Sequence, residues 1–251
     1  FNIMPSTLET GHTKNVSTFL ALIGFVNGWG ADYKPTKAIL SAANLLALHV
    51  QCEAAVKAAD DQEKIFSDLV DKRMIAFEPL QGLSTRVTNA FSVIDLADET
   101  VAGAKEINRK IQGKRATPKK DEPTAEGETP KGGKSISASQ MSYDNNVKHF
   151  SDLTAWVALQ AIYNPNETDL KVAALNAYKA TIDKANKDVI AGQVPYDNKL
   201  DTRDLLLYAK KTGMVDIALE VKKYAKSAFG VSSAKYKQIS GLKFTKQPRK
   251  K

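Results

Sequence analysis

The feature that most constrains the fold is an internal repeat. The spacing Asn-Val-x-x-Phe-x-x-Leu begins at Asn15 and again at Asn146, and a Tyr-x-Pro tripeptide begins at Tyr33 and again at Tyr163. Further matches follow in the same order, at separations of 128 to 131 residues: Leu40 and Leu170, Arg73 and Arg203, Gly82 and Gly213, Ile111 and Ile239. Collinear self-similarity indicates two copies of one supersecondary unit. The chain is therefore predicted to form two related domains rather than one large domain.

Each copy is predicted to be helical, because apolar residues recur at helical spacing and no long segment alternates with period two. The longest apolar stripe follows Pro165-Asn166, and Gly192 and Pro195 are expected to end that helix. Its counterpart in copy one is expected to begin at Pro35-Thr36. Further helices are expected over 14–26, over 64–77 and 196–210, over 83–96 and 214–229, and over 99–111 and 232–239.

The predicted fold class is all-α, with two tandem homologous antiparallel helical bundles of four to five helices each. The first bundle is expected over residues 1–113 and the second over 141–241. Residues 114–140 are rich in proline, glycine and charge and poor in apolar side chains, so they are predicted to form a flexible basic linker. Residues 242–251 are predicted to be a basic C-terminal tail.

Three segments that span most of copy two carry a resemblance to known sequences. They are residues 163–167, with Tyr163-Asn164-Pro165-Asn166-Glu167, residues 213–218, and residues 236–244. With the segment 110–120, they make the chain resemble an uncharacterised bacterial family of duplicated helical proteins. The resemblance implies a duplicated all-helical architecture in a bacterial protein, and it implies no activity.

No residue pattern points to catalysis, a metal or a cofactor. His49 and Cys52 lie one helical turn apart, but no other His or Cys pair supplies the remaining ligands, so Cys52 is interpreted as a buried thiol and His49 as an exposed polar residue. The carboxylates at 60, 61, 197, 201 and 204 are interpreted as solvated helix residues. Trp29, in a glycine-flanked turn, is a weak candidate for an exposed stacking residue. The protein is predicted not to be an enzyme and to need no cofactor.

Charge is the most informative functional feature. The chain carries a net charge of +8, but residues 98–120 hold 7 basic and 3 acidic side chains, and residues 222–251 hold 10 basic and none acidic. The rest of the chain is mildly acidic. The two basic stretches occupy equivalent ends of the two copies.

Clustered basic side chains bind phosphate through counterion release and carry little base specificity. We therefore predict a non-enzymatic RNA-associated protein, bound to the ribosome through its basic repeat ends, linker and tail. The predicted RNA-binding residues are Lys105, Arg109, Lys110, Lys114, Arg115, Lys119, Lys120, Lys222, Lys223, Lys226, Lys235, Lys237, Lys243, Lys246, Arg249, Lys250 and Lys251.

Two other classes of function remain open. The protein is alternatively a structural or protein-interaction module whose bundles bridge partners or self-associate. An enzyme with an active site assembled from scattered residues is the least favoured. The single cysteine excludes an intrachain disulfide, and no apolar run approaches the roughly 20 residues that span a membrane. A cytoplasmic location is expected.

Overall fold

The computed structural model describes residues 11–114 and 141–246, and all regular structure in these ranges is helical. The prediction of an all-α fold is therefore confirmed. The elements, in chain order, are α1 (His12–Gly28), η1 (Gly30–Asp32), η2 (Ala38–Leu40), α2 (Ala42–Phe77), α3 (Leu80–Ser92), α4 (Asp98–Ile111), α5 (Tyr143–Ala158), η3 (Thr168–Leu170), α6 (Val172–Tyr208), α7 (Met214–Phe229) and α8 (Ala234–Ser240).

Local signals explain several helix ends. Ser142 and Ser233 cap α5 and α8, because their hydroxyls accept hydrogen bonds from the backbone N–H groups of Asn145 and Tyr236 at 3.2 and 3.1 Å. Helix α4 carries acidic residues in its first turn and basic residues in its last, which suits the helix dipole. Gly230 ends α7 with a φ of 86°, a backbone conformation that side-chain-bearing residues rarely adopt.

Helices α2 and α6 are longer than the sequence predicts. Each was expected to be two helices, but α2 runs unbroken for 36 residues and α6 for 37, with Pro195 inside α6. The expectation that Gly192 and Pro195 end a helix is therefore wrong. Proline removes one helical hydrogen bond and crowds the preceding turn, which is tolerated here because buried residues on both sides of it, Val189 and Leu200, anchor the same helix.

The helices form two compact units, and neither unit is one sequence copy. Unit 1 combines the chain up to Ser67 with the chain from Gly192 onward, and unit 2 consists of the chain from Asp68 to Ala191. Both long helices therefore pass from one unit to the other. This arrangement differs from the predicted tandem bundles over 1–113 and 141–241, because each unit takes helices from both halves of the chain.

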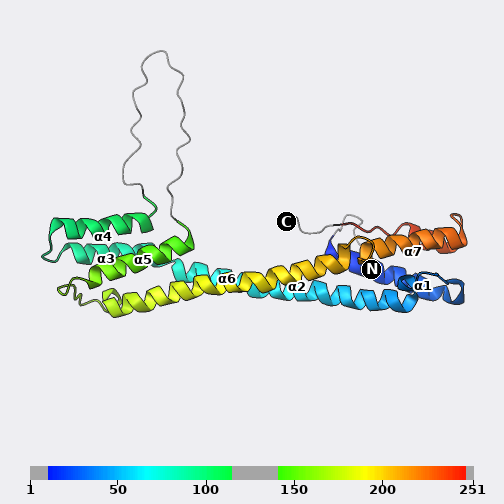
Figure 1. Ribbon diagram of the computed structural model, residues 1–251, viewed down its shortest axis with the longest axis horizontal. Helices are drawn as coiled ribbons and strands as arrows, with labels where there is room; N and C mark the ends of the chain where they lie inside the picture. The colour runs from blue at the N-terminus through cyan, green and yellow to red at the C-terminus, as the bar shows by residue number, and fades with distance from the viewer. Residues whose placement is uncertain (1–10, 115–140, 247–251) are drawn as a thin grey trace, which may run out of the picture. The chain divides into compact units, whose positions relative to one another are not determined.

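The core of unit 1 shows this exchange directly. It joins Phe19 and Leu22 of α1 and Leu45 of α2 to Ile217 and Val221 of α7, all of them fully buried. In Figure 1 the blue α1 accordingly lies beside the orange α7, in a unit that α8 completes. The first half of the chain thus supplies the first helix of this unit, and the second half supplies its last two.

The core of unit 2 likewise combines helices from both halves of the chain. It joins Val87 and Phe91 of α3 to Phe150 and Leu153 of α5, with Ile182 of α6 beside them. Helices α3, α4 and α5 pack together, as the green segments of Figure 1 show. The packing of α4 on α5 is close, because a Cβ added to Gly103 would lie 2.5 Å from the Trp156 ring.

Candidate functional site

The predicted RNA-binding lysines of unit 1 have two different environments, and Lys222 represents the buried one. Its ammonium group donates hydrogen bonds to the carbonyl oxygens of Ser240 and Leu242 at 2.9 and 2.8 Å. Burial lowers the pKa of Lys222 below its usual value. The prediction of Lys222 as an RNA-binding residue did not anticipate this environment, in which its partly buried side chain holds the chain segment that follows α8.

Two further lysines of this set form ion pairs within unit 1. Lys235 pairs with Asp32 and lies 4.8 Å from the centre of the Phe229 ring. Lys246 pairs with Asp216 at 2.6 Å, and this contact holds the pKa of Asp216 below its usual value. These two positive charges are locally compensated.

The segment predicted to be a free tail over residues 242–251 packs against unit 1 in its described part, 242–246. Leu242 and Phe244 contact the core. The Asn15 side chain donates to the Thr245 carbonyl oxygen at 2.7 Å and accepts from the Thr245 backbone N–H at 3.1 Å. These described residues of the predicted basic tail are thus held against unit 1, because a buried amide supplies the hydrogen bonds that an extended backbone requires.

Four of the predicted RNA-binding lysines of unit 1 remain exposed and make no side-chain ion pair within the described parts of the chain. They are Lys223 and Lys226 on α7, Lys237 on α8 and Lys243 in the packed segment. Helix α7 contacts α8, so three of the four lie on neighbouring helices of one unit. Their ammonium groups are available to an external anion.

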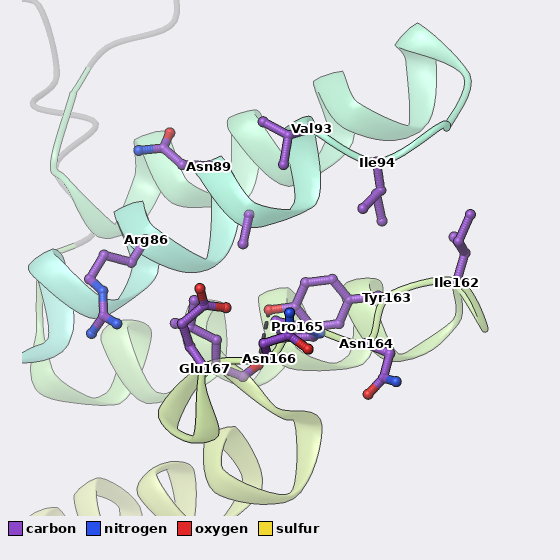
Figure 2. A pocket seen from close by; sticks show the side chains of 12 residues that line it. Arg86, Asn89, Val93, Ile94, Ile162, Tyr163, Asn164, Pro165, Asn166 and Glu167 are labelled. Atoms are coloured by element: carbon purple, nitrogen blue, oxygen red, sulfur yellow. Dashed lines mark hydrogen bonds between the residues drawn. The ribbon is translucent and has the colours of Figure 1, made fainter.

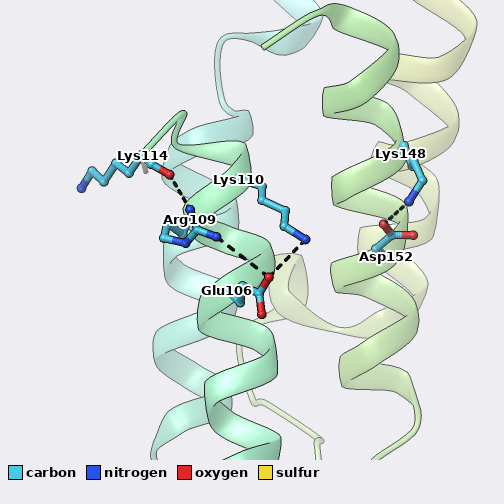
Figure 3. Close-up of polar contacts among 6 residues, drawn as sticks. All are labelled: Glu106, Arg109, Lys110, Lys114, Lys148 and Asp152. Atoms are coloured by element: carbon cyan, nitrogen blue, oxygen red, sulfur yellow. Dashed lines mark hydrogen bonds and ion pairs between the residues drawn. The ribbon is translucent and has the colours of Figure 1, made fainter. Parts of the chain in front are cut away.

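The predicted basic residues of unit 2 lie in the second half of α4 and just after it, and two of the four described ones have engaged side chains (Figure 3). Glu106 pairs with Lys110 at 3.3 Å and with Arg109 at 3.9 Å. Arg109 also donates to the Lys114 carbonyl oxygen at 2.7 Å. Lys105 and Lys114 have exposed side chains. Figure 3 shows a similar pair, Lys148 with Asp152, on α5.

The remaining predicted RNA-binding residues lie outside the described ranges: Arg115, Lys119, Lys120, Arg249, Lys250 and Lys251. The described basic residues at the two repeat ends belong to different units. Residues 105–114 lie in unit 2, and residues 222–246 lie in unit 1. A shared sequence position in the two copies therefore does not place the two basic stretches in one unit.

Three residues considered for metal or thiol chemistry are either buried in the core or paired on the surface. Cys52 is fully buried as predicted, and burial raises the pKa of its thiol to about 12. His49 is also buried, so the interpretation of His49 as an exposed polar residue is wrong. Asp61 pairs with Lys57 and Lys64 on the exposed surface of α2. Residues 11–114 and 141–246 contain no group of three or more side chains that could hold a metal ion.

Trp29 is not an exposed stacking residue. It is buried, its ring meets Phe229 edge-on at a centroid distance of 5.3 Å, and its indole N–H donates to Gln238 Oε1 at 2.9 Å. These partners come from α7 and α8, which belong to the other half of the chain. Because they are distant in sequence, the local turn signal around Trp29 could not indicate them.

The sequence did not predict the polar cluster that joins α1 to the end of α6 in unit 1. His12 Nδ1 lies 2.7 Å from the hydroxyl of Tyr208, and Asn15 donates to the same hydroxyl at 3.4 Å. Burial, followed by the nearby Arg203, lowers the pKa of His12. The cluster links the start of α1 to the last residue of α6.

In unit 2 a different polar cluster occupies the corresponding place. The Arg73 guanidinium lies 3.9 Å from the centre of the Tyr143 ring and donates to Asn186 at 3.3 Å. Asn186 donates in turn to Asp144 at 2.7 Å. The recurrence of arginine at 73 and 203 was visible in the sequence, but the partners were not.

A hollow in unit 2 lies between α3 and the loop that leads from α5 to η3 (Figure 2). It measures about 440 Å³. Its walls include Ala90, Tyr163, Asn164 and Pro165. Val93 and Ile162 also line it and are 82% and 54% exposed, so large apolar side chains stand at its mouth.

No family model, curated protein or solved structure matches the chain. None of the helices over residues 11–114 and 141–246 is long and apolar enough to cross a membrane.

Proposed function

We propose that this protein is a non-enzymatic, RNA-associated protein that contacts phosphate groups through the basic side chains of unit 1. The observation that carries the proposal is the distribution of charge. The described residues of unit 1 include 16 basic and 10 acidic side chains, whereas those of unit 2 include 12 and 13. The basic segment 249–251 follows unit 1 in the chain and adds three more positive charges.

The four exposed lysines at 223, 226, 237 and 243 define this candidate phosphate-binding surface. Their ammonium groups pair with no carboxylate among the described residues, so contact with a phosphate breaks no ion pair there, unlike contact with Lys235 or Lys246. Lysine contacts to phosphate carry no base information, so binding without base preference is expected. The assembly we propose as the target is the ribosome, in the cytoplasm.

The test is a set of two variants with equal changes of charge. The first replaces Lys223, Lys226, Lys237 and Lys243 by alanine. The control replaces four lysines that stand in intrahelical ion pairs: Lys57, Lys72, Lys148 and Lys184. Binding of a fluorescent single-stranded RNA 20-mer is followed by anisotropy between 50 and 200 mM salt.

Four phosphate contacts correspond to a salt slope of about 3, or roughly 50-fold in affinity over this salt range. The first variant should lose this dependence and the control should keep it. Salt-sensitive co-sedimentation with ribosomes should be lost in the same variant. Equal RNA binding by the two variants, or no RNA binding by the unaltered protein, would refute the proposal. Removal of residues 242–251 is a poorer test, because residues 242–246 pack against unit 1.

A protein-interaction module is the second candidate function, and one observation favours it. Two large apolar side chains that line the pocket of Figure 2 in unit 2, Val93 and Ile162, are exposed. Exposed apolar groups beside a pocket are typical of protein-binding surfaces. This candidate does not involve the lysines of unit 1.

We also infer that the two halves of the chain are homologous copies. The Tyr33 hydroxyl donates to the Leu40 carbonyl oxygen at 2.8 Å, and the Tyr163 hydroxyl donates to the Leu170 carbonyl oxygen at 3.0 Å. Both tyrosines are buried, and each bond spans seven residues. The same hydrogen bond from a tyrosine hydroxyl to a backbone carbonyl oxygen at matched positions supports a common origin for the two segments.

A further inference from the structure

The loop that follows α1 in unit 1 is covered by a tyrosine from α7. The Tyr224 hydroxyl accepts a hydrogen bond from the backbone N–H of Lys34 at 3.1 Å. The ring of Tyr224 meets the ring of Tyr33 edge-on, with centroids 5.2 Å apart and planes at 89°. Tyr224 thus lies against the loop with its ring on an aromatic face and its oxygen on a backbone donor.

Unit 2 contains the same loop without this tyrosine. Asn164-Pro165 follow Tyr163 as Lys34-Pro35 follow Tyr33. Helix α3 begins at Leu80 and α7 at Met214, and both first residues are buried. Counted from these starts, the seventh residues are Arg86 and Glu220, and the eleventh residues are Ala90 and Tyr224.

This register differs by three residues from the sequence match of Gly82 with Gly213, and ion pairs in the two units support it. Glu220 of α7 pairs with Lys37, just before η2, at 2.5 Å. Arg86 of α3 pairs with Asp169 in η3. The seventh residue of each helix therefore pairs with a residue in or just before the 3-10 helix of its own unit, and the eleventh residue, one turn further on, reaches the loop. At that position unit 1 has a phenol ring and unit 2 has a methyl group.

The space that Tyr224 fills in unit 1 corresponds to the open pocket of unit 2. Ala90 forms part of its wall, together with Tyr163, Asn164 and Pro165 (Figure 2). The described residues supply no acceptor for the backbone N–H of Asn164, whereas Lys34 donates to Tyr224. The pocket thus offers an aromatic wall and a backbone donor in the arrangement that holds a tyrosine side chain in unit 1.

We propose that this pocket binds a tyrosine side chain of a partner polypeptide. Its hydroxyl accepts the hydrogen bond from the Asn164 N–H, and its ring packs between Ala90 and Tyr163. A polypeptide is the source that fits the mouth of the pocket, because the exposed side chains of Val93 and Ile162 match apolar residues that flank the tyrosine. The proposal does not depend on RNA binding, which concerns unit 1.

The direct test is an NMR titration of the full chain, with the Asn164 amide as the reporter. The probes are the capped peptides Leu-Tyr-Leu and Leu-Phe-Leu, and p-cresol. The tyrosine peptide should shift the Asn164 resonance saturably and bind about fivefold more tightly than the phenylalanine peptide, because one hydrogen bond contributes about 1 kcal/mol. It should also bind more tightly than p-cresol. Equal affinity for p-cresol would indicate a small-molecule site, and no shift at Asn164 would exclude the pocket; either result overturns the proposal.

A variant that fills the pocket from within supplies an independent test. Ala90→Tyr places a phenol where unit 1 has one, so it should abolish the peptide-induced shift and raise the Tm. The control is Gln81→Tyr, on an exposed position of α3 outside the pocket, which should leave both unchanged. Unaltered peptide binding by folded Ala90→Tyr refutes the proposal.

The reverse variant keeps the proposal testable if Ala90→Tyr fails to fold. Tyr224→Ala opens the corresponding space in unit 1, and p-cresol should then shift the Lys34 amide resonance, which it does not shift in the unaltered protein. Failure of p-cresol to enter that space would show that the two loops do not share a phenol-binding geometry, and the proposal would be wrong.

Discussion

Replacement of Asn15 by alanine should release the chain segment that follows α8. Asn15 makes two hydrogen bonds to the backbone of Thr245, at 2.7 and 3.1 Å, and a longer one of 3.4 Å to Tyr208. Each good hydrogen bond contributes about 1 kcal/mol net. The free energy of opening for the segment 242–246 should therefore fall by about 2 kcal/mol, which is roughly a 30-fold increase in the population of the open form.

Asn146 provides a matched control, because it is the residue equivalent to Asn15 on α5. Its side chain makes one long hydrogen bond, of 3.4 Å, to Met141, and its buried Oδ1 accepts none from the described residues. Asn146→Ala therefore removes only one long hydrogen bond, and it should destabilise the fold less than Asn15→Ala does. The two variants delete the same atoms from corresponding helices.

Limited trypsin digestion followed by mass spectrometry measures the effect, because Lys243 and Lys246 lie in the segment itself. When opening is fast relative to cleavage, the cleavage rate follows the open population. Cleavage at these sites should accelerate roughly 30-fold in Asn15→Ala and less than threefold in Asn146→Ala. Cleavage at Lys223, within α7, reports global unfolding and should change less. A similar rate for both variants at Lys243 would refute the reasoning.

Three further outcomes are expected. Gly103→Ala should destabilise unit 2 by about 1–3 kcal/mol in chemical denaturation, because its methyl group would overlap the Trp156 ring; an unchanged midpoint would contradict this. Cys52 should react with a thiol reagent only after denaturation, because the thiol is buried and its pKa is raised to about 12; rapid labelling of the folded chain would argue against this packing. Burial lowers the pKa of His12 and His149 in the folded chain, so the unfolded chain binds protons more readily. The free energy of unfolding should therefore be highest above about pH 6.5 and fall below that pH. A variant with His12→Gln and His149→Gln should lose less of this free energy as the pH falls.

Much of the local structure follows from local signals in the sequence. Helix α7 has the predicted bounds, and α1 and α4 begin or end within about two residues of theirs, because caps and apolar periodicity are local. The ends predicted at Gly192 and Pro195 failed, because buried residues in both units anchor one continuous helix. Such anchoring depends on partners far along the chain, which a window of neighbouring residues does not contain.

The candidate site was predicted less well than the helices, for the same reason. The positive charge could be located from the sequence. Whether the ammonium groups of Lys222, Lys235 and Lys246 are engaged depends on carbonyl oxygens and carboxylates that long-range packing brings to them. Lys235, for example, finds its partner 203 residues away at Asp32. The pocket of unit 2 depends on the small side chain of Ala90, whereas Tyr224 fills the corresponding place in unit 1.

The exchange of helices between the two halves agrees with the pattern of charge. Lys37, from the first half, pairs with Glu220 of the second, and Asp169, from the second half, pairs with Arg86 of the first. If each half folded on itself, Lys37 would lie in a unit with Arg86 instead of Glu220, and Asp169 in a unit with Glu220 instead of Arg86. Neither attractive pair would then form.

Each of these exposed ion pairs is weak, worth about 0–1 kcal/mol, so charge alone does not build the units. Loss of two attractive pairs nevertheless distinguishes two otherwise similar packings of the same helices, because the two halves have similar apolar patterns in their sequences. The charges of Lys37, Asp169, Arg86 and Glu220 are therefore a source of specificity in the fold. Sequence divergence between the halves selects which partner each helix takes, while the shared apolar pattern supplies most of the stabilisation.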